Sequence, residues 1–263
     1  MVRRLAMPLL GAALGVIGAP ALAHMPYVLP SVFDAGARKQ VTVEASFTED
    51  AFRPEVVMND APFEITGPDG TTSRLGEPRL FRDMSLVEAS LPDDGVYRLS
   101  SGQRLGRMGK MYRVGSEWKI VGEGAAPPAG AALVDVQSTT LADAYVLRGK
   151  PGDTGALKVR GKALEIHPLG DPTTITAGQP FALEVLYNGR GLAKASVSLF
   201  REAGYYDGRK ITAEVQTDAA GHLTITPPDA GRYLLLVRHR DVAPAGAAAP
   251  YFSYSVTLAF EAM

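Results

Sequence analysis

Apolar residues recur mostly at every second position along this chain. Valine, valine, alanine and phenylalanine alternate with polar residues over 41–47, and similar runs occupy 181–187 and 252–260. Such alternation is typical of antiparallel strands with one buried face. Turn sequences rich in Pro, Asp, Asn and Gly separate the runs, and no helical stripe of ten or more residues is found. The pattern predicts an all-β protein with sandwich architecture.

A short motif, D-x-G-x-Y, occurs twice. It reads Asp-Asp-Gly-Val-Tyr at 93–97 and Asp-Ala-Gly-Arg-Tyr at 229–233, each time after a proline and at the start of a strand pattern. In immunoglobulin-like sandwiches, a tyrosine at such a place bonds back to the preceding corner. The repeat therefore predicts two immunoglobulin-like β-sandwich domains. We expect them at 24–121 and 161–263, with a linker and crossing segment over 122–160.

The first 23 residues have the features of a secretory signal peptide. Arg3 and Arg4 precede an apolar run over 5–17, and an Ala-x-Ala cleavage sequence occupies 21–23. We expect cleavage after Ala23 and a periplasmic location. His24 then becomes the first residue of the mature protein.

Composition narrows the classes of function. The 263-residue chain has a net charge of −1, which gives no electrostatic reason to expect a nucleic-acid partner. It has no cysteine, so disulfides and thiolate metal sites are excluded. Beyond the leader, no apolar run approaches the roughly 18 residues of a membrane span, so we expect no membrane insertion of the mature chain. No G-x-S-x-G elbow, H-E-x-x-H motif or phosphate loop occurs, and the sequence favours a binding protein over an enzyme.

An N-terminal histidine is a strong candidate metal ligand. The α-amine and the imidazole Nδ1 of His24 can close a chelate ring on one ion, and nitrogen ligands of this kind suit nickel, cobalt, copper or zinc. The reference pKa of the amine is roughly 7.7–8.0, so a metal can displace its proton near neutral pH.

The other histidines are open to two interpretations each. Period two places His239 on the same face as Tyr233, at the exit of a core strand, either as the partner ligand of His24 or as a histidine packed at the core edge. His167 precedes a proline-fixed turn, either as a third ligand or as a surface residue. His222 lies in a hairpin turn, where solvent exposure is expected.

Several stretches resemble a family of exported bacterial proteins described as periplasmic components of nickel or cobalt uptake (NikM/NikK-like). The resemblance covers nearly the whole mature chain. The stretches that carry it are Ala23-His24, Pro30, Gly36, Val41-x-Val43, 143–151, 164–169, 186–195, 217–221 and 231–235. The resemblance implies that His24 and His239 bind nickel or cobalt, and that an inner-membrane metal transporter is the partner. Residues 25–27 and the Ala/Pro-rich loop 241–250 depart from the family's pattern.

These observations lead to one main hypothesis and two alternatives. We expect a periplasmic protein that binds a divalent transition metal through His24, His239 and His167 and captures it or delivers it to an uptake system. Copper fits the nitrogen ligands as well as nickel or cobalt does. The alternatives are a copper oxidative enzyme with a terminal-histidine brace, and a metal-free module that binds a glycan or a protein.

Overall fold

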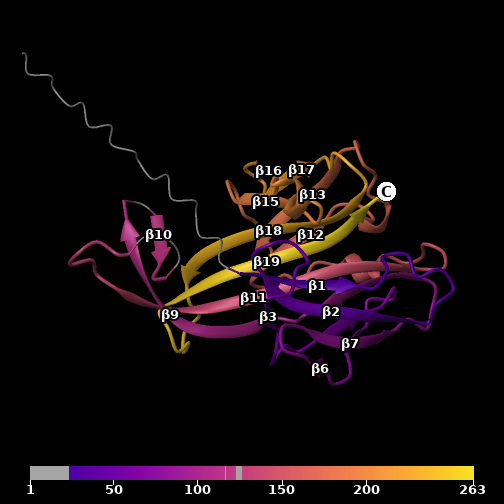
Figure 1. Ribbon diagram of the computed structural model, residues 1–263, viewed down its shortest axis with the longest axis horizontal. Helices are drawn as coiled ribbons and strands as arrows, with labels where there is room; N and C mark the ends of the chain where they lie inside the picture. The colour runs from indigo at the N-terminus through magenta and orange to yellow at the C-terminus, as the bar shows by residue number, and fades with distance from the viewer. Residues whose placement is uncertain (1–23, 116, 123–125) are drawn as a thin grey trace, which may run out of the picture.

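The computed structural model describes residues 24–115, 117–122 and 126–263 as three layers of β-sheet (Figure 1). The predicted signal peptide, residues 1–23, lies outside the described residues. One outer sheet has the order β1-β2-β7-β6, with β3 beside β2. Its strands are β1 (Met25–Pro30), β2 (Gln40–Thr48), β3 (Val56–Val57), β6 (Arg79–Leu80) and β7 (Ser85–Ser90).

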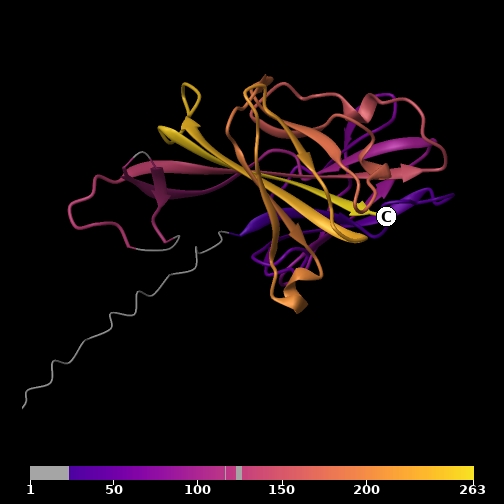
Figure 2. The same ribbon diagram turned by 90° about the horizontal axis from the view of Figure 1, so that it is seen from above.

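The central sheet is the largest, with the order β16-β15-β18-β19-β11-β8-β4-β5 and the β9–β10 hairpin attached to β11. Its strands are β4 (Glu64–Thr66), β5 (Thr72–Arg74), β8 (Gly95–Ser100), β9 (Arg104–Val114), β10 (Glu117–Ile120), β11 (Val134–Arg148), β15 (Ser196–Arg201), β16 (Ile211–Gln216), β18 (Gly231–Val242) and β19 (Tyr251–Ala262). Figure 2 shows the long strands of this sheet extending beyond the outer sheets toward the β9–β10 hairpin.

The third sheet covers the other face of the central one. It consists of β12 (Leu164–Pro168), β13 (Phe181–Tyr187), β14 (Arg190–Gly191) and β17 (His222–Ile225). The described residues also form three short helical turns: η1 (Gly155–Leu157), η2 (Pro172–Thr174) and α1 (Gly204–Asp207). Within the described residues, no helix is long and apolar enough to cross a membrane.

Alternate side chains of the central sheet enter two different hydrophobic cores. On β18, Leu234 and Leu236 pack in the first core with Tyr27 of β1. Their neighbours Tyr233 and Leu235 pack in the second core, which contains the apolar residues of β12 and β13. The predicted all-β sandwich architecture is confirmed, and the two sandwiches share one sheet.

The strand β11 lies in the middle of that shared sheet. It pairs in parallel with β19 and antiparallel with β8 and β9. Ala142 and Ala144 belong to the first core, whereas Leu141 and Tyr145 belong to the second. The segment 122–160, which the sequence predicts as linker and crossing segment, therefore contains a strand that is buried on both faces.

Both D-x-G-x-Y motifs form tyrosine corners. The Tyr97 hydroxyl donates to the Asp93 carbonyl at 2.8 Å and accepts from the Asp93 N–H at 2.9 Å. The Tyr233 hydroxyl bonds the Asp229 carbonyl and N–H at 2.8 and 3.3 Å. Each hydroxyl thus satisfies two backbone groups of the turn that precedes its strand.

Removal of either corner hydroxyl is expected to destabilise the fold. Tyr97→Phe and Tyr233→Phe should each lower the free energy of unfolding by about 1–3 kcal/mol, because the ring stays buried while turn backbone groups lose their partner. Urea denaturation measures this. Tyr206, whose side chain is exposed, provides the matched control: Tyr206→Phe should change stability by less than about 0.5 kcal/mol. Equal effects in all three variants would contradict the structural role of the corners.

Candidate metal site at His24

Strand pairing places His24 beside two glutamates. His24 directly precedes β1, whose first residue, Met25, pairs with Thr48 at the end of β2. Glu49 follows Thr48, so it lies next to His24. The chain then turns and returns through Glu55, whose Oε1 accepts a hydrogen bond from the Glu49 N–H at 3.1 Å. The register of β1 on β2 therefore builds the cluster.

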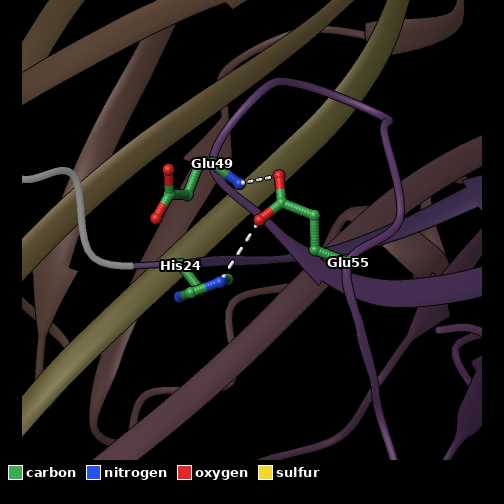
Figure 3. Close-up of side chains that lie close together, drawn as sticks. All are labelled: His24, Glu49 and Glu55. Atoms are coloured by element: carbon green, nitrogen blue, oxygen red, sulfur yellow. Dashed lines mark hydrogen bonds and ion pairs between the residues drawn. The ribbon is translucent and has the colours of Figure 1, made fainter.

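Nitrogen and oxygen ligand atoms converge in this cluster (Figure 3). One ligand atom from each of His24, Glu49 and Glu55 lies within 4.8 Å of the others. The shortest separation, between His24 Nε2 and Glu55 Oε2, is 3.3 Å. The His24 and Glu55 side chains are 43% and 36% exposed, so an ion from solvent can reach them.

The two edges of the His24 ring have different surroundings. Figure 3 shows Nε2 turned toward Glu55, while the other ring nitrogen, Nδ1, points away from Glu55. The Glu49 carboxylate also extends away from Glu55. Nδ1 is the nitrogen that can chelate together with an α-amine on the same residue. The ring orientation therefore directs Nε2 to Glu55 and turns Nδ1, the nitrogen that can chelate with the α-amine, away from Glu55.

A cavity of about 800 Å³ opens beside the cluster. His24 and Glu49 border it, and Glu55 is not among its lining residues. Its lining also includes residues of β9, β11, β18 and β19, with four arginines (Arg104, Arg107, Arg238 and Arg240), and one further carboxylate, Asp60. These guanidinium groups repel a cation from their side of the cavity, so a cation is best accommodated between His24 and Glu49.

The structure does not bring His239 to His24. The His239 ring packs on the ring of Tyr187 of β13, with centroids 4.6 Å apart. Its neighbours Arg238 and Arg240 line the cavity that His24 borders. Because successive side chains of a strand point to opposite faces, His239 lies on the far face of the central sheet. The prediction that His24 and His239 bind one metal ion together is therefore corrected: the two side chains lie on opposite faces of the central sheet.

His167 is also separate from His24 and already has partners. Its Nδ1 lies 2.8 Å from Glu184 Oε1, and its Nε2 lies 2.6 Å from the Leu157 carbonyl oxygen. Both ring nitrogens are engaged in the second sandwich, so His167 is not the third ligand of a His24 site. His222 is exposed, as expected, and lies 3.7 Å from Glu184.

His239 should make stability sensitive to mild acid. Burial lowers its pKa below the ordinary value, and the charge of Asp241 opposes this shift. Since the unfolded chain then takes up the proton first, stability falls as the pH drops below the ordinary histidine pKa of about 6.5. Urea denaturation of wild type and His239→Phe between pH 7 and 5 should show a shallower decline in the variant. Parallel declines would contradict this assignment.

Glu55 is the member of the cluster that sequence reasoning missed. Glu49 closely follows the alternating run at 41–47, and that run is a signal which the sequence does offer. Glu55 lies in an irregular stretch before the two-residue strand β3, and no local pattern marks it. Only the pairing of β2 with both β1 and β3 places it near His24.

The described chain is thus an all-β protein of immunoglobulin-like sandwich layers with a His/Glu cluster at the start of its first strand. A family model, the domain of unknown function DUF4198, matches residues 21–241, and the chain belongs to that family. No curated protein matches the sequence.

The solved structures that match this chain are distant from it in sequence, and their TM-scores are low. The D0–D1 domains of intimin are 14% identical, with 90% of this chain and 99% of that chain covered and a TM-score of 0.22. The adhesin InvE of Yersinia pseudotuberculosis is 13% identical, with coverages of 89% and 58% and a TM-score of 0.21. A DUF4785 family protein of Legionella pneumophila is 11% identical, with coverages of 80% and 50% and a TM-score of 0.24.

Proposed function

We propose that this protein is an exported binding protein for a divalent transition metal, which it captures or passes to an uptake system in the inner membrane. The convergence of His24, Glu49 and Glu55 carries the proposal. In the mature protein, the α-amine and Nδ1 of His24 form a chelate, and the Glu49 carboxylate supplies a further ligand. Glu55 orients the imidazole by accepting a hydrogen bond from Nε2.

The separations in the cluster are compatible with one bound ion. Two donors that each lie about 2.1 Å from one ion are roughly 3–3.5 Å apart when they meet at 90–109°. The cluster's limit of 4.8 Å can contract to that spacing through side-chain rotation, because the side chains lie at the surface. One amine, one imidazole and one carboxylate form a donor set for nickel, cobalt, copper or zinc rather than for calcium.

The position of Glu55 matches a common feature of metal-bound histidines. Such a histidine usually donates its second ring N–H to a carboxylate or a carbonyl, which fixes the ring and its tautomer. The 3.3 Å separation between Nε2 and Glu55 Oε2 suits this role.

The resemblance to metal-uptake components favours nickel or cobalt as the bound metal. The nitrogen ligands themselves suit copper equally well. Within the described residues, carboxylates rather than a second histidine lie beside His24. This donor set supports binding ahead of a terminal-histidine brace that activates oxygen on copper.

Substitution of the proposed ligand should weaken metal binding. Glu49→Gln is expected to lower nickel affinity about 10- to 100-fold, because a charged ligand becomes a neutral one. Glu55→Gln should cost less, since the amide oxygen still accepts from Nε2. Calorimetric nickel titration of protein that begins at His24 measures both, with Glu214→Gln on the exposed side of β16 as the matched control.

The nickel affinities of the three variants, compared with wild type, show which glutamate binds the ion. Equal affinities in wild type, Glu49→Gln and Glu214→Gln would refute the proposed site. A larger loss in Glu55→Gln than in Glu49→Gln would show that Nε2 and Glu55, rather than Nδ1 and Glu49, hold the ion. Repeating the titrations with copper and cobalt ranks the metals.

A further inference from the structure

A second cavity, distinct from the His24 cavity, lies where the two sandwiches meet. It has a volume of about 660 Å³. One wall is the central sheet, through residues of β4, β5, β8, β11 and β19. The opposite wall is the segment 155–164, which runs from η1 into β12.

That opposite wall is held firmly on the sheet. The Arg98 Nη1 group donates to the Lys158 carbonyl at 2.9 Å. Arg160 forms two hydrogen bonds with the carboxylate of Asp143, at 2.7 and 2.8 Å. Glu165 accepts from the backbone N–H groups of Arg160 and Gly161 at 2.9 Å each. The cavity is therefore preformed by contacts between the two halves of the chain.

Two buried polar atoms on the cavity wall have no hydrogen-bond partner within the described residues. They are Arg98 Nε and Thr139 Oγ1, on residues that are 7% and 2% exposed. A buried donor without a partner is costly, and such groups are rare in folded proteins. Two of them on one cavity indicate that a bound molecule satisfies them.

Charge and shape define the class of that molecule. Five cationic side chains line the cavity against one carboxylate, Glu64: Arg74, Arg98, Lys158, Arg160 and Lys162. Two further carboxylates, Asp143 and Glu165, lie behind the wall and are already hydrogen-bonded. Apolar side chains also line the cavity, among them Leu141, Leu164 and Val256, beside the polar side chains of Thr66, Thr72 and Gln103.

We propose that this cavity binds a small organic anion that has a carboxylate or phosphate group and an apolar body. The anionic group accepts from Arg98 Nε and the Thr139 hydroxyl, and the lysines at the mouth contribute long-range attraction. The apolar body lies against Leu141 and Val256. This binding site is independent of the His24 cluster.

Phenylphosphate and phenylacetate are suitable probes, because they share an apolar ring and differ in the anionic group. Each is titrated into metal-free, ¹⁵N-labelled protein, and amide shifts are followed by NMR. We expect saturable shifts at Thr139, Thr140 and residues 158–162 with at least one probe, and none with benzyl alcohol, which lacks the charge. The probe that binds more tightly identifies the anionic group. No saturable shift with either anion, or shifts confined to other surfaces, would overturn the proposal.

Two variants test the assigned contacts. Thr139→Val keeps the shape of the side chain and removes the hydroxyl, and Lys162→Gln removes a charge at the exposed mouth. Each should weaken the tighter probe about tenfold, because a hydrogen bond or an ionic attraction to the anion is lost. Lys39→Gln, on the exposed surface outside the cavity, should leave binding unchanged. Unaltered affinity in both cavity variants would refute the site even if the probes bind.

Discussion

Asp143→Asn is expected to lower the free energy of unfolding by about 3–5 kcal/mol at pH 7, because it leaves a largely buried guanidinium without its counter-charge. The Asp143 side chain is 3% exposed and that of Arg160 15% exposed, and their two hydrogen bonds join β11 to the segment before β12. No other ion pair described in the structure links the two sandwiches at comparable burial.

The effect of this substitution should depend on pH in a defined direction. Burial raises the pKa of Asp143, but the charge and hydrogen bonds of Arg160 outweigh burial and hold the pKa below the ordinary value. A lowered carboxyl pKa contributes stability that is present above the unfolded value of about 3.9 and is lost as the pH falls below it. The stability difference between wild type and variant should therefore narrow below about pH 4.

Urea denaturation of both proteins at neutral and acidic pH measures this dependence. Asp135→Asn is the matched control, because Asp135 pairs with Lys110 at 2.7 Å at the surface and should contribute about 0–1 kcal/mol. Equal losses in the two variants at pH 7, or a difference that does not narrow in acid, would contradict the role assigned to the buried pair.

The sequence was sufficient for the fold class but not for the way the sheets combine. Alternation along β2, β13 and β19 predicted half-buried strands, and the two tyrosine corners predicted paired sandwiches. β11 gave no such pattern, because both of its faces are buried and polar residues such as Thr139 and Asp143 interrupt its apolar ones. Its parallel pairing with β19 joins segments more than a hundred residues apart, and no local signal marks that pairing.

The candidate site shows the same limit. Period two correctly placed His239 on one face with Tyr233 and Leu235. The sequence could not show that β1 packs against the other face, beside Leu234 and Leu236. His24 remains the candidate ligand, but its partners come from the adjacent β2–β3 turn instead of from β18.

Loss of the free α-amine should have a large effect on metal binding. Acetylation of the α-amine of His24 converts it into an amide, whose nitrogen does not coordinate a metal while it keeps its proton, and the chelate with Nδ1 is lost. We expect nickel affinity to fall at least about 100-fold, because two linked nitrogen ligands become one. His24→Ala should cause a similar loss, since it removes the imidazole and leaves the amine as a single ligand.

The most direct measurement compares two proteins that differ only in the N-terminal amine. Both begin at His24, one with a free α-amine and the other with an acetylated one, and nickel is titrated into each by calorimetry at the same pH. If His24 binds the metal through its amine and imidazole, the protein with the free amine binds one ion tightly and the acetylated protein binds at least about 100-fold more weakly. Equal affinities in the two proteins would contradict the chelate at His24 and the metal-binding function built on it.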